Sequence, residues 1–104
     1  MQRIKTIIAL KEVESDLNKG ESFYELQEFG IGKYFRDCII SDIESLYLYA
    51  GIHTKHLKAY RLLSKRFPYA IYYIIKGNNA IVVAVLDMRR DPQSIKYQLT
   101  QRNF

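Results

Sequence analysis

The sequence predicts an α+β fold in which an N-terminal strand and an α-helical hairpin pack on a small antiparallel β-sheet. Apolar residues follow a helical period up to Gly51, and near-continuous apolar, β-branched and aromatic runs replace that period afterwards. The 104 residues, 48% hydrophobic and 26% charged, have the length and composition of one folded domain. We therefore expect a single domain over residues 1–104.

The first element is expected to be a short strand over residues 2–8. Ile4, Thr6 and Ile8 alternate onto one side of the chain there, and Ile7 lies on the other side. Apolar residues on both sides indicate a strand that is mostly buried.

Two helices are expected next. The apolar stripe of the first contains Leu10, Val13, Leu17 and Tyr24, with Gly20 on the same side. Glycine costs about 1 kcal/mol against alanine inside a helix, so Gly20 indicates close approach of another backbone. After a connection at residues 29–32 the stripe resumes, and Gly51 suits a helix C-terminal cap. The resumed stripe consists of Ile31, Phe35, Ile39, Ile43, Leu46 and Ala50.

The two helices should pack as an antiparallel hairpin because the connection between them is short. Their acidic side chains are expected to lie in water and not to form a catalytic cluster. These side chains are Glu12, Glu14, Asp16, Glu21 and Glu25.

Three strands are predicted over residues 60–63, 70–75 and 80–86. Gly77 and Asn78 tolerate the positive φ of a hairpin turn, so the last two strands should pair antiparallel. Their apolar runs indicate burial on both faces, with the helical hairpin covering one. Pro92 is expected to end the last strand, and residues 93–104 form either a short helix or a tail.

Charge is distributed unevenly along the chain. Residues 1–51 contain 6 Lys/Arg and 9 Asp/Glu, a net charge of −3, whereas residues 52–104 contain 10 Lys/Arg and 2 Asp/Glu, a net charge of +8. Segregated charge of this kind attracts nucleic acid or an acidic protein surface. The later half is therefore expected to hold an acidic partner.

Several classes of site are excluded by the sequence. It contains no phosphate-binding loop, no dinucleotide-binding fingerprint and no helical His/Glu spacing for zinc. His53 and His56 have no carboxylate or cysteine close in sequence, so a surface role is expected, and the single Cys38 suits core packing. We expect no metal and no cofactor.

The chain is expected to stay in the cytoplasm and to cross no membrane. Its longest uncharged runs, residues 45–54 and 77–86, are shorter than the roughly 20 apolar residues of a membrane span. Residues 1–10 lack the apolar stretch and cleavage site of a signal peptide.

The remaining chemistry is a cationic set interleaved with tyrosines. Arginine binds phosphates and carboxylates bidentately, and tyrosine stacks on bases or anchors a protein interface, although it is also a favoured strand residue. The cations are Lys55, Lys58, Arg61, Lys65, Arg66, Arg89 and Arg90, and the tyrosines are Tyr60, Tyr69, Tyr72, Tyr73 and Tyr97.

Residues 60–73 (YRLLSKRFPYAIYY) and 84–92 (AVLDMRRDP) resemble the RelE/ParE superfamily of bacterial type II toxins. Residues 23–25 (FYE) and 41–44 (SDIE) lie where its plasmid-stabilisation branch has a helical hairpin. The resemblance implies a strand, two helices and an antiparallel sheet, in the order already expected. It also implies a toxin that is neutralised by a cognate antitoxin with an acidic or amphipathic segment.

The superfamily contains two mechanisms. RelE-like members cleave mRNA in the ribosome and place an arginine directly after the aromatic residue that starts the penultimate strand; here Ala70 follows Tyr69. ParE-like members poison DNA gyrase and need no catalytic residues. The missing arginine favours a ParE-like toxin that acts by binding. The alternatives are a ribosome-dependent mRNA endonuclease, which would use Arg61, Arg66, Arg89 and Tyr97, or an inactive member that retains only antitoxin binding.

The partner-binding surface is expected to consist of Arg61, Lys65, Arg66, Tyr72, Arg89, Arg90 and Tyr97. Asp87 and Asp91 flank Arg89 and are expected to pair with it. Exposed apolar surface around Tyr72, Tyr73 or Phe104 would also be covered by the antitoxin, so the free chain is expected to dimerise or aggregate.

Overall fold

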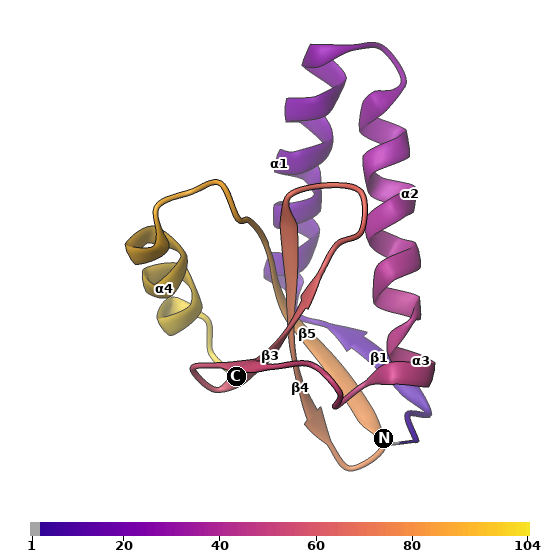
Figure 1. The fold of residues 1–104 in the computed structure, drawn as a ribbon, viewed down its shortest axis with the longest axis vertical. Coiled ribbons are helices and arrows are strands. Elements are labelled where there is room, and N and C mark those ends of the chain that lie inside the picture. The colour runs from indigo at the N-terminus through magenta and orange to yellow at the C-terminus, as the bar shows by residue number, and fades with distance from the viewer. Residues whose placement is uncertain (1–2) are drawn as a thin grey trace.

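The structure is a computed structural model that describes residues 3–104. Gln2, where the predicted first strand begins, lies outside the described residues. A helical hairpin stands on a five-stranded sheet in Figure 1, and a C-terminal helix lies on the opposite side of that sheet. The elements are β1 (Thr6–Ala9), α1 (Lys11–Gln27), α2 (Ile31–Glu44), α3 (Leu46–Tyr49), β2 (Lys55–His56), β3 (Ala59–Leu63), β4 (Tyr69–Lys76), β5 (Asn79–Asp87) and α4 (Pro92–Gln101).

The strands lie in the order β1-β5-β4-β3-β2. The pairs β2–β3, β3–β4 and β4–β5 are antiparallel, as predicted for the last two strands, and Gly77 adopts a φ of +62° in the turn before β5. The N-terminal strand joins this sheet as an edge strand parallel to β5, with Thr6 opposite Asn79.

The predicted burial of the first strand is correct only at its start. Ile4 is buried and Ile7 is partly buried against the core, but Ile8 on the other face of β1 is exposed. The chain before Thr6 is irregular, so the alternation of a strand does not connect Ile4 to Ile8.

The helical hairpin covers one face of the sheet, as predicted. α1 continues through Gly20, and the Phe35 ring of α2 packs so closely there that a Cβ at position 20 would lie 2.5 Å from the ring. Close approach at Gly20 is therefore confirmed, although the approaching group is a ring and not a backbone. The buried cluster on this face includes Val13, Leu17, Phe35, Ile39, Ile43, Ile71, Tyr73, Val82 and Val85.

The second helix is interrupted at Ser45, a break that the sequence pattern did not predict. The Ser45 hydroxyl donates to the Asp42 carbonyl over 2.6 Å, and the short α3 follows. Gly51 then has a φ of +96°, which agrees with its predicted place after the end of a helix.

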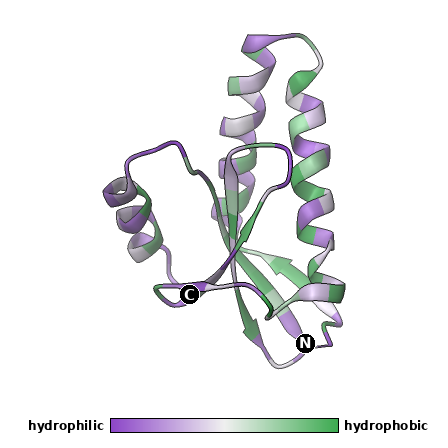
Figure 2. Cartoon of the chain, in the orientation of Figure 1, coloured by the Kyte–Doolittle hydropathy of each residue, from purple (hydrophilic) through white to green (hydrophobic). Residues whose placement is uncertain are grey.

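The opposite face of the sheet is covered by α4, so the central strands are buried on both sides. Figure 2 shows these strands as mostly hydrophobic, while the helices carry hydrophobic and hydrophilic residues together. Of the two predictions for residues 93–104, the helix is correct. A second buried cluster lies between this face of the sheet and α4, and it includes Ala59, Ala70, Tyr72, Val83, Ala84, Leu86, Ile95 and Leu99.

The start of α4 corrects two predictions. Pro92 does not end the last strand, because β5 ends at Asp87 and Pro92 is the first residue of α4, where its missing N–H costs no helical hydrogen bond. Asp91 does not pair with Arg89 either. Its carboxylate accepts a hydrogen bond from the Gln93 N–H over 3.3 Å and caps the helix.

Candidate partner-binding groove

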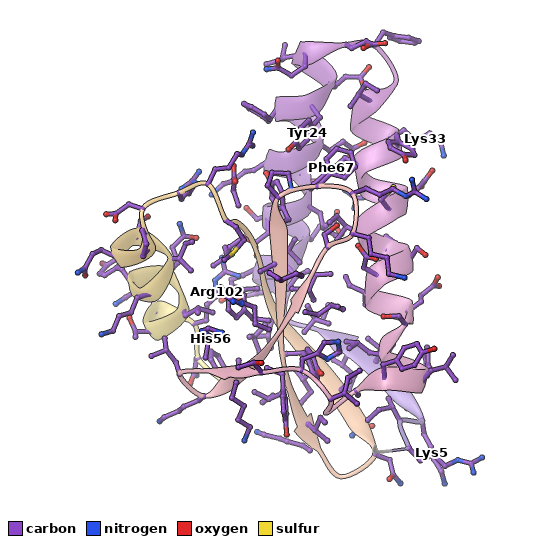
Figure 3. All side chains as sticks on the ribbon, in the orientation of Figure 1. Lys5, Tyr24, Lys33, His56, Phe67 and Arg102 are labelled. Carbon is purple, nitrogen blue, oxygen red and sulfur yellow. The ribbon has the colours of Figure 1, made fainter. Side chains whose placement is uncertain are left out.

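Two cavities flank α4 on the side that faces the β2–β3 hairpin. One has a volume of about 330 Å³ and the other about 520 Å³, and Leu57 and Leu99 line both. We name the two cavities together the α4 groove. Figure 3 shows His56 and Arg102, one from each cavity, in the space between α4 and the central strands.

The first cavity combines an apolar floor with a basic rim. Leu57, Met88, Ile95 and Leu99 supply the apolar side chains. The rim consists of His56, Arg61, Arg90 and Lys96. No Asp or Glu side chain lines either cavity in the part of the chain that the structure describes.

Arg61 and Tyr72 lie opposite each other on β3 and β4. The Tyr72 side chain is buried and its hydroxyl is 3.7 Å from the Met88 sulfur. Burial raises the pKa of Tyr72, and the charge and hydrogen bond of Arg61 only partly oppose that rise. Tyr72 is therefore neutral at physiological pH and helps to fix the Arg61 guanidinium at the groove.

Three cations of the first cavity have no salt bridge to a carboxylate in the described residues, whereas Arg102 of the second cavity is paired with Asp16. Within residues 3–104, no salt bridge joins Arg61, Arg90 or Lys96 to a carboxylate, whereas Arg36 and Arg89 are both paired. A cation without an internal partner is the one that an anionic ligand can neutralise without breaking an existing contact. The groove is therefore suited to an acidic, partly apolar ligand.

Arg89 lies outside this groove, against α1. Its Nε and Nη2 donate to Asp87 over 3.0 and 2.8 Å, which confirms the predicted pairing with Asp87. The guanidinium also lies over the Phe23 ring, 5.2 Å from its centroid. Burial opposes ionisation of Asp87, but the hydrogen bonds and charge of Arg89, together with the charge of Arg90, outweigh it, and the pKa of Asp87 is lowered.

Lys65, Arg66 and Tyr97 are also separate from the α4 groove. Lys65 and Arg66 line a cavity of about 320 Å³ against α2, together with Asp37 and Asp42. The Tyr97 side chain is 64% exposed on α4. The structure therefore brings Arg61, Tyr72 and Arg90 together and distributes the other predicted site residues over other surfaces.

The prediction of exposed apolar surface around Tyr72 and Tyr73 is wrong, because both side chains are buried between the sheet and its covering helices. The Tyr73 hydroxyl accepts a hydrogen bond from the Gly51 N–H over 2.9 Å and contacts His53 Nδ1. His53 is half-buried by this contact, while His56 lies on the groove. Phe104 is half-buried at the second cavity.

Asp16 corrects the prediction of a wholly solvated acidic face. Its side chain is buried, and its two carboxylate oxygens accept hydrogen bonds from Arg102 over 2.8 Å each. No local pattern indicates this pair, because the two residues lie 86 positions apart. The pair fixes the C-terminal end of α4 and with it one wall of the groove.

Other kinds of site are not found in the described residues. No group of three or more His, Cys, Asp or Glu side chains in residues 3–104 could hold a metal ion. In the same residues no helix has both the length and the apolar character needed to cross a membrane.

No family model matches the sequence, and no curated protein matches it. Among solved structures, the chain is similar to a chain of the chromosomal ParDE TA system from P. aeruginosa, with a TM-score of 0.71 and 14% sequence identity. The similarity covers 79% of this chain and 94% of that chain. The predicted α+β, RelE/ParE-like fold class is confirmed, and the chain shares the fold of a component of a ParDE toxin–antitoxin system.

Proposed function

We propose that this chain is a ParE-like toxin of a type II toxin–antitoxin system, that it acts in the cytoplasm by binding DNA gyrase, and that a cognate antitoxin neutralises it. The shared fold supports the toxin–antitoxin class. The observation that carries the proposal is the first cavity of the α4 groove, where cations with no salt bridge in the described residues surround an apolar floor. An acidic amphipathic antitoxin segment matches both properties of this surface.

The arrangement of side chains favours binding over RNA cleavage. The four residues of the nuclease alternative lie on different surfaces. Arg61 lines the α4 groove, and Arg66 lines the cavity against α2. Arg89 lies over the aromatic rings of α1, and Tyr97 is exposed on α4. A nuclease needs its acid, base and charge stabiliser around one phosphate. These four side chains do not line one common cavity.

Tyr69 is not a substitute general base. Burial, and after it the charge of Asp87, raises the pKa of Tyr69 to about 12. A hydroxyl with that pKa keeps its proton at neutral pH.

Gyrase is the preferred target because the residue after Tyr69 is Ala70, where RelE-like nucleases have an arginine.

The proposal is tested by a supercoiling assay with purified gyrase and this chain in excess. Inhibition is expected, and unchanged supercoiling by folded chain would contradict the gyrase target. Mapping of transcript 5′ ends after induction distinguishes the alternatives, because new cleavage sites would identify the mRNA endonuclease. A chain that causes neither effect but binds its antitoxin would be an inactive member of the superfamily.

Self-association of the free chain belongs to the same proposal. The apolar side chains left for it include Leu57, Ile52 and Phe104, since Tyr72 and Tyr73 are buried. A concentration-dependent mass in analytical ultracentrifugation that falls when antitoxin is added is the expected result.

A further inference from the structure

Leu57 has an unusual backbone conformation for its residue type. Its φ is +60°, and it is the one residue other than glycine with a positive φ among residues 3–104. The left-handed region brings Cβ too close to the following carbonyl, so residues without Cβ, or with a short polar side chain, usually occupy it. A leucine there indicates that something other than local stability determines the residue.

The turn that contains Leu57 does not require leucine. Leu57 and Lys58 form the two-residue loop between β2 and β3, since His56 pairs with Ala59 across it. Loops of this length favour glycine, asparagine or aspartate where φ is positive. Glycine or asparagine at position 57 would therefore suit the turn better.

Packing within the chain does not explain the leucine either. The Leu57 side chain is 53% exposed and belongs to neither buried cluster. It does line both cavities of the α4 groove, opposite Leu99. The strained turn thus presents an apolar side chain at the junction of the two cavities.

We propose that Leu57 is the apolar anchor with which the α4 groove holds an acidic amphipathic segment of a protein partner. The side chains around the groove determine the chemistry of that segment: Lys58, Arg61, Arg90 and Lys96 select acidic residues, and Leu57, Ile95 and Leu99 select apolar ones. An RNA strand fits less well, because the tyrosine of the first cavity, Tyr72, is buried and offers no face for a base to stack on, and the floor of the cavity is aliphatic.

This inference rests on the partner-binding part of the proposed function, in which the segment belongs to the antitoxin, and it is independent of gyrase. The strained backbone of Leu57 is then explained by binding, because residues with strained backbone cluster at ligand-binding positions. Stability and affinity should therefore respond in opposite directions when position 57 is changed.

The test uses three probes and a set of variants. The probes are a helix-forming peptide with leucine on one face and glutamate on the other, the same peptide with lysine in place of glutamate, and a single-stranded RNA dodecamer. The variants are Leu57→Gly, Leu57→Asn and Leu57→Met, with Leu26→Ala as the control, because Leu26 is 88% exposed on the distant hairpin. Calorimetry measures affinity, urea unfolding measures stability, and amide chemical shifts locate the binding site.

The acidic peptide is expected to shift the amide signals of Leu57, Ile95 and Leu99, and the lysine peptide is not. Leu57→Gly and Leu57→Asn should raise the urea midpoint and weaken the acidic peptide by about tenfold or more. Leu57→Met, which keeps an apolar side chain, and Leu26→Ala should retain affinity.

Three results would overturn the inference: unchanged affinity in Leu57→Gly, a lower urea midpoint in that variant, or tighter binding of RNA than of the acidic peptide at the groove. Failure of the proposed function has a different signature. A chain that binds the acidic peptide through Leu57 but does not stop growth retains the anchor and is not an active toxin. A chain whose toxicity is relieved equally well in Leu57→Gly is a toxin without this anchor.

Discussion

Asp16 and Arg102 form a buried, two-pronged ion pair that joins α1 to the end of α4. Arg102 Nη1 and Nη2 each donate to a carboxylate oxygen of Asp16 over 2.8 Å. The Val85 N–H donates to Asp16 over 2.9 Å, and Arg102 Nη1 donates to the Val83 carbonyl over 3.0 Å. One cluster therefore connects the first helix, the central strand β5 and the C-terminus.

Removal of the charge on Asp16 should destabilise the fold strongly. Asp16→Asn leaves the buried Arg102 guanidinium without its counter-ion, which costs about 3–5 kcal/mol when one partner of a buried pair is lost. Urea unfolding followed by circular dichroism measures the free energy. The matched control is Asp37→Asn, whose pair with Lys33 is exposed to solvent and should contribute little to stability. Equal effects of the two substitutions would contradict the structural importance of the Asp16–Arg102 pair.

Gly20→Ala should destabilise the helical hairpin even though alanine is the better helix former. The new Cβ would lie 2.5 Å from two carbons of the Phe35 ring, so the ring or the helices must move. Overpacking of this kind costs about 1–3 kcal/mol. Ser15→Ala, on the exposed face of the same helix, should be neutral or slightly stabilising. A stabilised Gly20→Ala variant would show that the hairpin is not closely packed at this position.

Acidification should reduce stability through His53. Partial burial lowers the pKa of His53, so the unfolded chain binds a proton more readily than the folded chain. The stabilising contribution is complete above the unfolded pKa of about 6.5 and is lost as the pH falls through the folded pKa. Urea unfolding between pH 7.5 and 5 should show this loss. The His53→Gln variant should show a smaller slope, and an identical slope would contradict the assignment.

Arg89 and Arg90 are adjacent, but their substitution should have different effects. Arg90→Gln removes a groove cation that forms no salt bridge in the described residues and should slow association with an acidic antitoxin, with an effect that shrinks as salt is added. Arg89→Gln removes the salt bridge to Asp87 and the contact with Phe23, so it should lower stability and affect association less. Stopped-flow association and urea unfolding of both variants measure these quantities. Equal salt-dependent slowing by both would indicate that the two arginines share one surface.

Elements with a regular pattern of several residues could be predicted from the sequence. The runs at residues 70–75 and 80–86 predict β4 and β5 within one or two residues, because burial on both faces requires apolar residues throughout. The two-residue β2 has too few positions for any pattern, and the break at Ser45 depends on a hydrogen bond to the Asp42 carbonyl.

The candidate site was predicted in part, as a set of residues but not as a surface. Arg61 and Arg90 reach the α4 groove, whereas Arg89 folds back on Asp87. A count of charges does not show where each side chain points, so the sequence could not assign the adjacent Arg89 and Arg90 to different surfaces. The positive φ of Leu57 is also determined by the β2–β3 pairing and has no sequence signal, since leucine is unusual at that position.

The central claim is that this chain is a toxin whose partner-binding surface is occupied by an antitoxin, and growth after induction tests it most directly. Cells that express the chain alone should stop growing, and cells that also express its cognate antitoxin should grow normally. Unchanged growth in cells that contain folded chain at a level detectable by immunoblot would contradict the account.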